Sequence, residues 1–182
     1  MHHEALVALP QMLAHFAIER PILVGHSDGA SIALIAAGAG AIEPRGLVVI
    51  APHVFVEEVS VKQIAAARVA FETSDLRTRL ARRHADVDAT FYGWNDIWLD
   101  PRFRAWNIEA SVARVRAPML VIQGDRDEYG TLAQVASIRR AVPATSALIV
   151  KGAGHAPHLE APDAVLDAIA SFIAATSARD GP

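Results

Sequence analysis

The sequence predicts an α/β protein in which helices flank a mostly parallel sheet. Four apolar runs have the length and composition of buried strands, at 21–24, 46–52, 118–122 and 147–150. Helical patterns separate these runs, as expected where helical crossovers join parallel strands. With 182 residues, the chain is long enough for one domain with a sizeable core and an insertion.

The first element is predicted to be a helix over residues 2–19. Its apolar positions recur at steps of three and four residues, at Leu6, Leu9, Leu13 and Phe16. Pro10 lies inside this pattern, where a proline kinks a helix or marks its effective start. The run at 21–24 is then the first expected strand.

The strand at 46–52 ends the first part of the predicted core, which comprises residues 1–52 and 114–182. Residues 53–113 change in character and are predicted to form a helical insertion. They include charge-rich helical stretches such as 75–83, and they hold all three tryptophans and eight of the eleven aromatic residues.

The last helix is expected to run from Pro162 to about Thr176. A proline suits the first turn of a helix, where its missing N–H is not needed. One face of this helix is apolar and comprises Val165, Leu166, Ile169, Phe172 and Ile173. Residues 177–182 are expected to be a frayed tail.

The most informative motif is the pentapeptide at 25–29, Gly-His-Ser-Asp-Gly, between the first predicted strand and a predicted helix. A serine hydroxyl is a weak nucleophile until a base removes its proton. A sharp strand-to-helix turn exposes this hydroxyl and aims backbone N–H groups at a reacting carbonyl. We expect Gly25 and Gly29 to be needed because a Cβ at either place would crowd the turn.

Two later strand ends carry polar residues that suit Ser27. The run at 118–122 leads to Gly124 and an acidic cluster, and the run at 147–150 leads to a glycine-rich loop that contains His155. Parallel sheets carry their chemistry at the carboxyl ends of their strands. The order serine, acid, histidine along the chain is the order expected for a hydrolase with a nucleophile elbow.

Taken together, these motifs resemble the α/β-hydrolase family, and the resemblance covers nearly the whole chain. It implies that Ser27 is the nucleophile, that His155 is its general base, and that an acid orients the histidine. In the family the acid usually stands three residues after the strand-end glycine, which here is Asp127. Asp125 is the alternative acid, and its other role would be to cap or brace the turn.

The resemblance also implies an oxyanion donor and a substrate pocket. The backbone N–H of Asp28, the residue after the nucleophile, is the expected donor. The insertion resembles the family's helical cap, which roofs the pocket, and ligand sites are mostly apolar and aromatic. The candidate substrate-binding residues are therefore Phe91, Tyr92, Trp94 and Trp98. The alternative is that these aromatic side chains form the small core of the cap itself.

One part of the family pattern has no counterpart in this sequence. In the family a second oxyanion donor comes from a loop after an earlier strand, usually marked by His-Gly. No segment before Gly25 resembles that strand and loop, so one edge of the strand at 21–24 is expected to lack a partner. Three explanations stay open: an N-terminally incomplete piece of a longer protein, a short protein that completes its sheet as a homo-oligomer, or a fold remnant without catalysis.

The expected function is that of a serine hydrolase that cleaves an ester or related acyl bond of a small, apolar substrate, without a cofactor. A C–C bond hydrolase or a perhydrolase would use the same triad. A catalytically incomplete fragment that binds a ligand or a partner chain is the non-enzymatic alternative. No metal is expected, because the acids of the insertion lie in polar turns without ligand spacing. These acids are Asp86, Asp88, Asp96 and Asp100.

Composition favours a globular protein whose partner is a small-molecule substrate. The formal net charge of −3 gives no basic surface for nucleic acid. No apolar run approaches the ~20 residues that span a bilayer, and no secretory leader is recognised, so no membrane partner is expected. Cysteine is absent, which excludes disulfides and thiolate metal sites, and the cytoplasm is the expected location.

Overall fold

A computed structural model describes residues 1–178 of the chain. Of the tail predicted at 177–182, positions 179–182 lie outside the described residues. The chain divides into two compact units. The first comprises Met1–Phe55 and the chain from Asn107 onward, and the second comprises Val56–Trp106.

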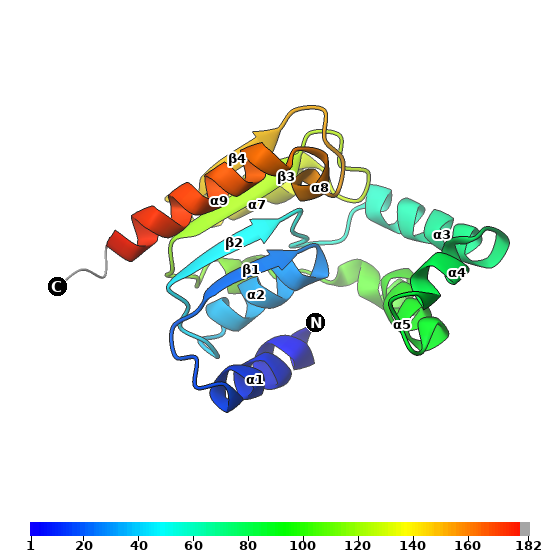
Figure 1. Cartoon of the computed structure of the whole chain (residues 1–182), viewed down its shortest axis with the longest axis horizontal. Helices are drawn as coiled ribbons and strands as arrows, with labels where there is room; N and C mark the ends of the chain where they lie inside the picture. Colours follow the sequence, from blue (N-terminus) through cyan, green and yellow to red (C-terminus); the bar gives the residue numbers. More distant parts are fainter. Residues whose placement is uncertain (179–182) are drawn as a thin grey trace. The chain divides into compact units, whose positions relative to one another are not determined.

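The first unit is built on a four-stranded, all-parallel sheet (Figure 1). Its strands are β1 (Ile22–His26), β2 (Gly46–Ile50), β3 (Met119–Gly124) and β4 (Ser146–Val150), and they lie in that order. In the register, Val24 pairs with Val48, Val48 with Leu120, and Leu120 with Ser146. All four predicted strands and the α/β fold class are therefore confirmed.

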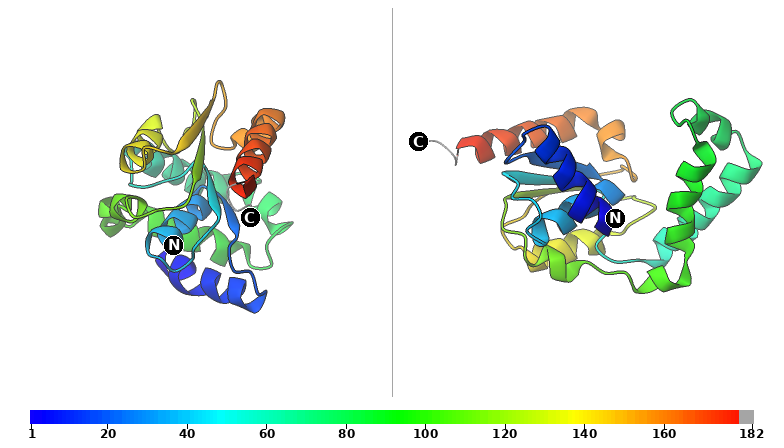
Figure 2. Two further views of the ribbon diagram at one scale, coloured as in Figure 1. Left: turned by 90° about the vertical axis from the view of Figure 1, so that its left-hand side faces the viewer. Right: turned by 90° about the horizontal axis from the view of Figure 1, so that it is seen from below.

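Helices cover both faces of this sheet, with α9 (Pro162–Ser177) on one face and α2 (Asp28–Gly38) and α7 (Leu132–Ala141) on the other (Figure 2). Every residue of the two central strands β2 and β3 is buried, because helices lie on both sides of them. The remaining helices of the unit are η1 (Glu4–Ala8), α1 (Leu9–His15), α6 (Glu109–Val112) and α8 (Pro157–Glu160).

The predicted first helix is present but shorter, and part of it is π-helical. Segment η1 is π-helical and leads into α1, with Pro10 in the first turn of α1. A proline has no N–H to continue an α-helical ladder, which accounts for the irregular turn before it. The helix ends at His15 rather than at 19, because Ala17 adopts a left-handed backbone with φ 53°.

The apolar stripe predicted for this helix is wrong in part. Leu13 is buried, but the side chains of Leu6 and Phe16 are 42% and 65% exposed. Ala5, which the pattern did not include, is fully buried. The π-helical turn at η1 shifts the faces of the helix, so spacing counted at 3.6 residues a turn fails there.

The final helix follows its prediction closely, since α9 runs Pro162–Ser177. Val165 is buried against the sheet, with Ile169 and Phe172 packed beside it. Leu166 and Ile173 are exposed, so the buried face is narrower than predicted. Within residues 1–178, no helix combines the length and the apolar character that crossing a bilayer would require.

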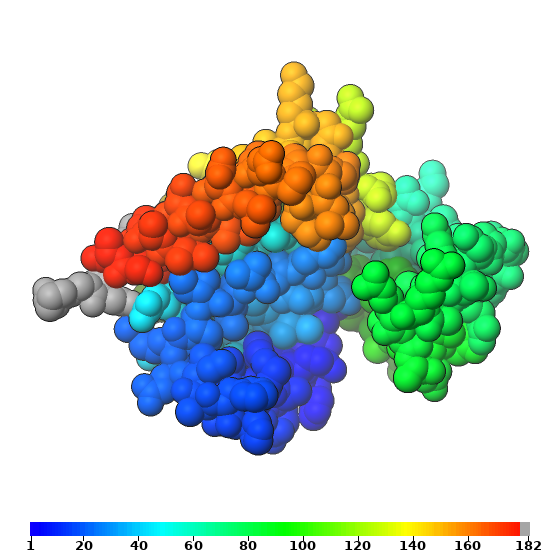
Figure 3. All heavy atoms as spheres, in the orientation of Figure 1, coloured from blue at the N-terminus to red at the C-terminus, as the bar shows by residue number. Residues whose placement is uncertain are grey.

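Strand β1 forms one edge of the sheet, as predicted. Within residues 1–178 it pairs with β2 alone. Val24, at the middle of the strand, is 55% exposed, and atoms of β1 reach the surface between α9 and α1 (Figure 3). Such an apolar edge can pair with another strand, and self-association through it stays a prediction.

The second unit consists of α3 (Glu58–Thr73), α4 (Leu76–Ala81), α5 (Val87–Leu99) and η2 (Pro101–Ala105). Its interior centres on Phe71 and Phe91, whose rings stack with centroids 3.8 Å apart. Of the acids that could have suggested a metal, Asp86 caps α5 and the other three accept hydrogen bonds from arginines. Asp88 accepts two hydrogen bonds from Arg77 at 2.8 and 2.7 Å, and Asp96 accepts one from Arg68.

Candidate active site

Three predicted residues lie just past the carboxyl ends of three parallel strands. Ser27 stands between β1 and α2, Asp127 lies in the loop after β3, and His155 lies in the loop after β4. Because the strands are parallel, these ends share one edge of the sheet (Figure 1). The fold therefore gathers residues that are up to 128 positions apart in the chain.

The backbone at Ser27 makes the sharp turn that the motif predicts. Its dihedral angles are φ 55° and ψ −122°, a conformation that a residue with a Cβ rarely adopts. Strain of this kind costs about 1–3 kcal/mol and persists only where the surroundings hold it. One contact that holds this backbone is the hydrogen bond that the Ser27 N–H donates to the Ile50 carbonyl at 2.9 Å.

The two glycines of the motif are not equally constrained. A Cβ built at Gly25 would lie 2.4 Å from the Gly29 carbonyl oxygen and 2.6 Å from the Ala30 nitrogen, so it cannot be accommodated. A Cβ at Gly29 would meet no described atom within 4 Å. The expectation of crowding is thus confirmed at Gly25 and wrong at Gly29, because the side of α2 at Gly29 is open.

This difference gives a matched pair of variants. We expect Gly25→Ala to lower the free energy of unfolding by about 3 kcal/mol or more, because backbone atoms must move to admit the methyl group. We expect Gly29→Ala to stay within about 1 kcal/mol of the parent, because alanine suits a helix. Urea denaturation measures both. A stable Gly25→Ala protein, or two variants of equal stability, would contradict the described turn.

A chain of hydrogen bonds joins the three residues. The Nε2 atom of His155 lies 2.9 Å from the Ser27 Oγ, and its Nδ1 lies 2.9 Å from both carboxylate oxygens of Asp127. With the proton on Nδ1, Nε2 accepts the serine hydroxyl proton. An imidazole held in this way can remove that proton as the hydroxyl attacks a carbonyl carbon.

Asp127 sits in a dense set of donors, and its side chain is 1% exposed. The N–H groups of Tyr129 and Gly130 donate to its Oδ1 at 2.8 and 3.1 Å, and the Gln123 Nε2 donates to its Oδ2 at 2.6 Å. Burial by itself would raise the pKa of this carboxyl group. The hydrogen bonds from His155, Tyr129 and Gly130 outweigh burial and hold the pKa below its ordinary value.

The lowered pKa of Asp127 predicts a dependence of stability on pH. A carboxyl group whose pKa is lower in the folded state stabilises the fold above its unfolded pKa, and this contribution is lost as pH falls through the folded pKa. The stability advantage of the parent over Asp127→Asn should therefore shrink below about pH 4. Urea denaturation from pH 7 to pH 3 measures it. An advantage that is constant or grows in acid would contradict this account.

The alternative acid, Asp125, has a different contact. Its Oδ1 accepts a hydrogen bond from the Gly152 N–H at 2.6 Å, so it braces the loop that leads to His155. Asp28 is the first residue of α2, and its N–H therefore lies at the positive amino end of that helix. This position is compatible with the expected role of the N–H as an oxyanion donor.

The sequence pattern assigned no catalytic role to several residues that lie near His155. The ring of Tyr129 lies 4.8 Å from the His155 ring and that of His53 lies 5.7 Å from it, measured between centroids. His26 ends β1 and Gln123 is the penultimate residue of β3, each next to a motif residue. A polar residue at such a place is the signal that could have found them. Within the described residues, no group of three or more acidic or histidine side chains is arranged to hold a metal.

The four aromatic candidates lie in the second unit. Phe91 and Trp98 are 6% and 2% exposed and belong to the interior of that unit, as the alternative interpretation expects. Trp94 meets the Phe91 ring edge-on, and the Tyr92 hydroxyl donates to Glu72 at 3.4 Å. Substrate contact by these four residues stays a prediction.

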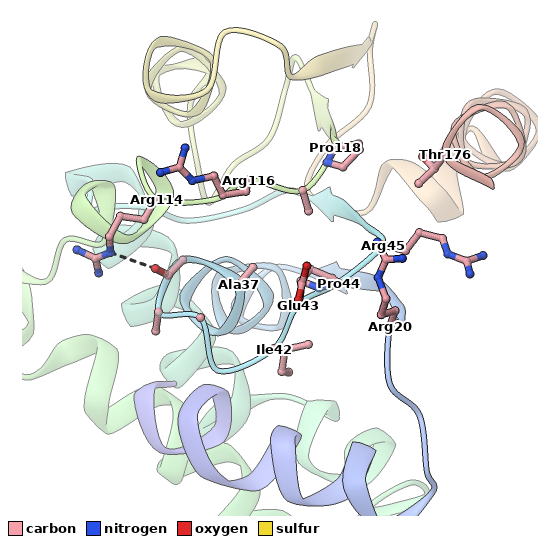
Figure 4. Close-up of a pocket in the computed structure, with 14 residues that line it drawn as sticks. Arg20, Ala37, Ile42, Glu43, Pro44, Arg45, Arg114, Arg116, Pro118 and Thr176 are labelled. Atoms are coloured by element: carbon pink, nitrogen blue, oxygen red, sulfur yellow. Dashed lines mark hydrogen bonds between the residues drawn. The ribbon is translucent and has the colours of Figure 1, made fainter. Parts of the chain in front are cut away.

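A cavity of about 740 Å³ lies at the opposite end of the strands from Ser27 (Figure 4). Arg20 and Arg45 line one side of it, and Arg114 and Arg116 line the other, so their charges do not converge. Arg114 donates to the carbonyl of Gly38, the last residue of α2, at 3.0 Å. This cavity is separate from the site around His155.

Comparison with known proteins agrees with the fold and the motifs. The sequence profile described as "Alpha/beta hydrolase family" matches residues 2–168. No curated protein sequence is significantly similar to this chain.

Solved structures of hydrolases are similar in fold. Proline iminopeptidase from Mycobacterium smegmatis has a TM-score of 0.75 at 17% identity, over 100% of this chain and 74% of that one. The meta-cleavage product hydrolase from Pseudomonas fluorescens has a TM-score of 0.74 at 15% identity, over 94% of this chain and 71% of that one. An E-2-(acetamidomethylene)succinate hydrolase has a TM-score of 0.72 at 21% identity, over 94% of this chain and 73% of that one.

Proposed function

Because the chain belongs to the alpha/beta hydrolase family, we propose that it is a serine hydrolase that cleaves an ester or related acyl bond of a small, apolar substrate. The observation that carries the proposal is the hydrogen-bonded chain from Ser27 Oγ through His155 to Asp127. The strained backbone of Ser27 supports it as well, since such strain gathers at functional sites.

In the proposed reaction, the Ser27 Oγ attacks the carbonyl carbon of the substrate while His155 Nε2 takes the hydroxyl proton. Asp127 stabilises the imidazolium that forms and keeps the ring in one orientation. The tetrahedral intermediate collapses, the C–O bond to the leaving group breaks, and His155 returns the proton to the departing alcohol. Water then hydrolyses the acyl-serine by the same steps, so the acid product and free Ser27 are formed.

Two further groups are assigned within this proposal. The Asp28 N–H is the oxyanion donor, at the positive end of α2. The second unit is the cap, and Phe91, Tyr92, Trp94 and Trp98 are its candidate contributions to the substrate pocket. An aromatic cap favours apolar acyl groups over charged ones.

Turnover of p-nitrophenyl esters tests this function. We expect an initial burst of nitrophenol, equal to the enzyme concentration, wherever deacylation is slower than acylation. Acetate, butyrate and octanoate esters then report the preferred acyl length, and a p-nitroanilide of the best acyl group distinguishes esterase from amidase activity. A folded protein with no turnover above background on the whole panel would contradict the proposal and favour the ligand-binding alternative.

A further inference from the structure

The residue immediately before the serine, His26, holds the backbone of the other reacting residue. The His26 Nε2 lies 2.8 Å from the carbonyl oxygen of His155. A carbonyl only accepts, so the imidazole donates and its proton is on Nε2. His26 is the last residue of β1, and this bond therefore ties the loop of His155 to the strand end that presents Ser27.

The bonds made by the N–H groups of His155 and its neighbour Gly154 are of another kind. Both donate to carboxylates: Gly154 to both oxygens of Glu160 at 3.1 Å, and His155 to Glu128 Oε2 at 3.2 Å. Both carboxylate residues are exposed, so water can replace either of them. His26 is only partly exposed, and water replaces its bond less readily.

The surroundings of His26 favour the neutral form of its ring. Burial lowers the pKa of His26, and the charges of His155 and His158 act in the same direction. Together they outweigh the hydrogen bond to the His155 carbonyl and the charge of Asp127, which raise the pKa. The rings of His158 and His155 pack against it, with centroids 4.7 and 5.0 Å away. The observed hydrogen bond requires a proton on Nε2, and the neutral Nε2–H tautomer of the imidazole supplies it.

This bond restricts the peptide group that carries the proposed base. His155 must keep Nε2 near the Ser27 Oγ while Nδ1 stays on Asp127, and rotation of its peptide group would break one of these contacts. Because His26 and Ser27 are adjacent, the strand end that carries the nucleophile also fixes the base. A misplacement of about 1 Å in such an arrangement costs about 100-fold in rate.

We propose that His26 is a positioning residue for His155, acting through the hydrogen bond from its Nε2 to the His155 carbonyl. The effect of His26 on the reaction rate rests on the proposed hydrolase function, whereas its effect on the position of the His155 side chain does not. Neither effect requires His26 to contact the substrate.

Replacement of His26 by residues with and without a donor tests the assignment. Glutamine places an N–H about as far from the backbone as Nε2, asparagine is about one bond shorter, and leucine has no donor. We expect His26→Leu and His26→Asn to lower kcat on p-nitrophenyl esters by about 10- to 100-fold with KM changed less than about threefold. We expect His26→Gln to stay within about threefold of the parent in kcat.

A readout independent of turnover is the proton on His155 Nδ1. Its hydrogen bond to Asp127 should give a strongly downfield proton resonance in NMR, which Asp127→Asn removes and so assigns. We expect this resonance to persist in His26→Gln and to broaden by faster exchange with water in His26→Leu. If the parent hydrolyses no ester, the proposed function fails while the resonance still decides the role of His26.

The matched control is His158→Leu, which removes a neighbouring imidazole that does not bond to the His155 carbonyl. It should keep kcat and the resonance of the parent. Parent-like kcat and resonance in His26→Leu would overturn the assignment, as would an equal loss in His158→Leu. Should His26→Leu fail to fold, the comparison of His26→Gln with His26→Asn decides, and equal values in those two would overturn it.

Discussion

Ser27→Ala is expected to reduce ester turnover by about a million-fold, to the background rate. The variant lacks the oxygen that attacks the carbonyl, and no acyl-serine can form. Folding should be nearly unchanged, because the Ser27 N–H that donates to Ile50 is retained and no larger group is introduced. Steady-state turnover and thermal unfolding measure the two effects.

The control for this experiment is Ser171→Ala, which removes the hydroxyl of an exposed serine in α9. It should behave like the parent in both assays. Turnover that survives in Ser27→Ala would remove Ser27 from the mechanism and leave the site around His155 without its proposed nucleophile.

Asp127→Asn is expected to lower kcat by about 10,000-fold. An asparagine turned with its amide toward His155 donates to Nδ1, which places the ring proton on Nε2, where it can no longer accept from Ser27. Asp125→Asn should lower kcat less than about tenfold, since asparagine keeps an oxygen that accepts from the Gly152 N–H. Steady-state kinetics of the two variants on the preferred ester decides between the acids. A larger loss in Asp125→Asn would reassign the role.

The sequence was sufficient for the fold class, because apolar runs and turn residues report strands and their ends directly. It placed β1 to β4 within about two residues and indicated that Ser27, Asp127 and His155 would share one edge of the sheet. Parallel topology makes such an inference safe, since all carboxyl ends then lie together. The choice of Asp127 over Asp125 as the residue near His155 came from the family pattern, and the geometry agrees with it.

The features that could not be predicted from the sequence depend on how its segments contact one another in the folded chain. Gly29 looked as constrained as Gly25 because the motif is symmetric in sequence, whereas only Gly25 faces the first turn of α2. The exposure of Leu6 follows from a π-helical turn that no spacing rule anticipates, and Phe16 lies beyond the last residue of the helix. The bond from His26 to the His155 carbonyl joins residues 129 positions apart, and only the folded chain reveals it.

Covalent labelling with a fluorophosphonate probe tests the central claim most directly, because the probe reacts with a serine that its surroundings have activated. The folded chain is incubated with the probe, digested, and mapped by mass spectrometry. The account predicts modification of the peptide that contains Ser27, and none in Ser27→Ala. A folded chain that stays unmodified, or one that is modified at another residue, would contradict it.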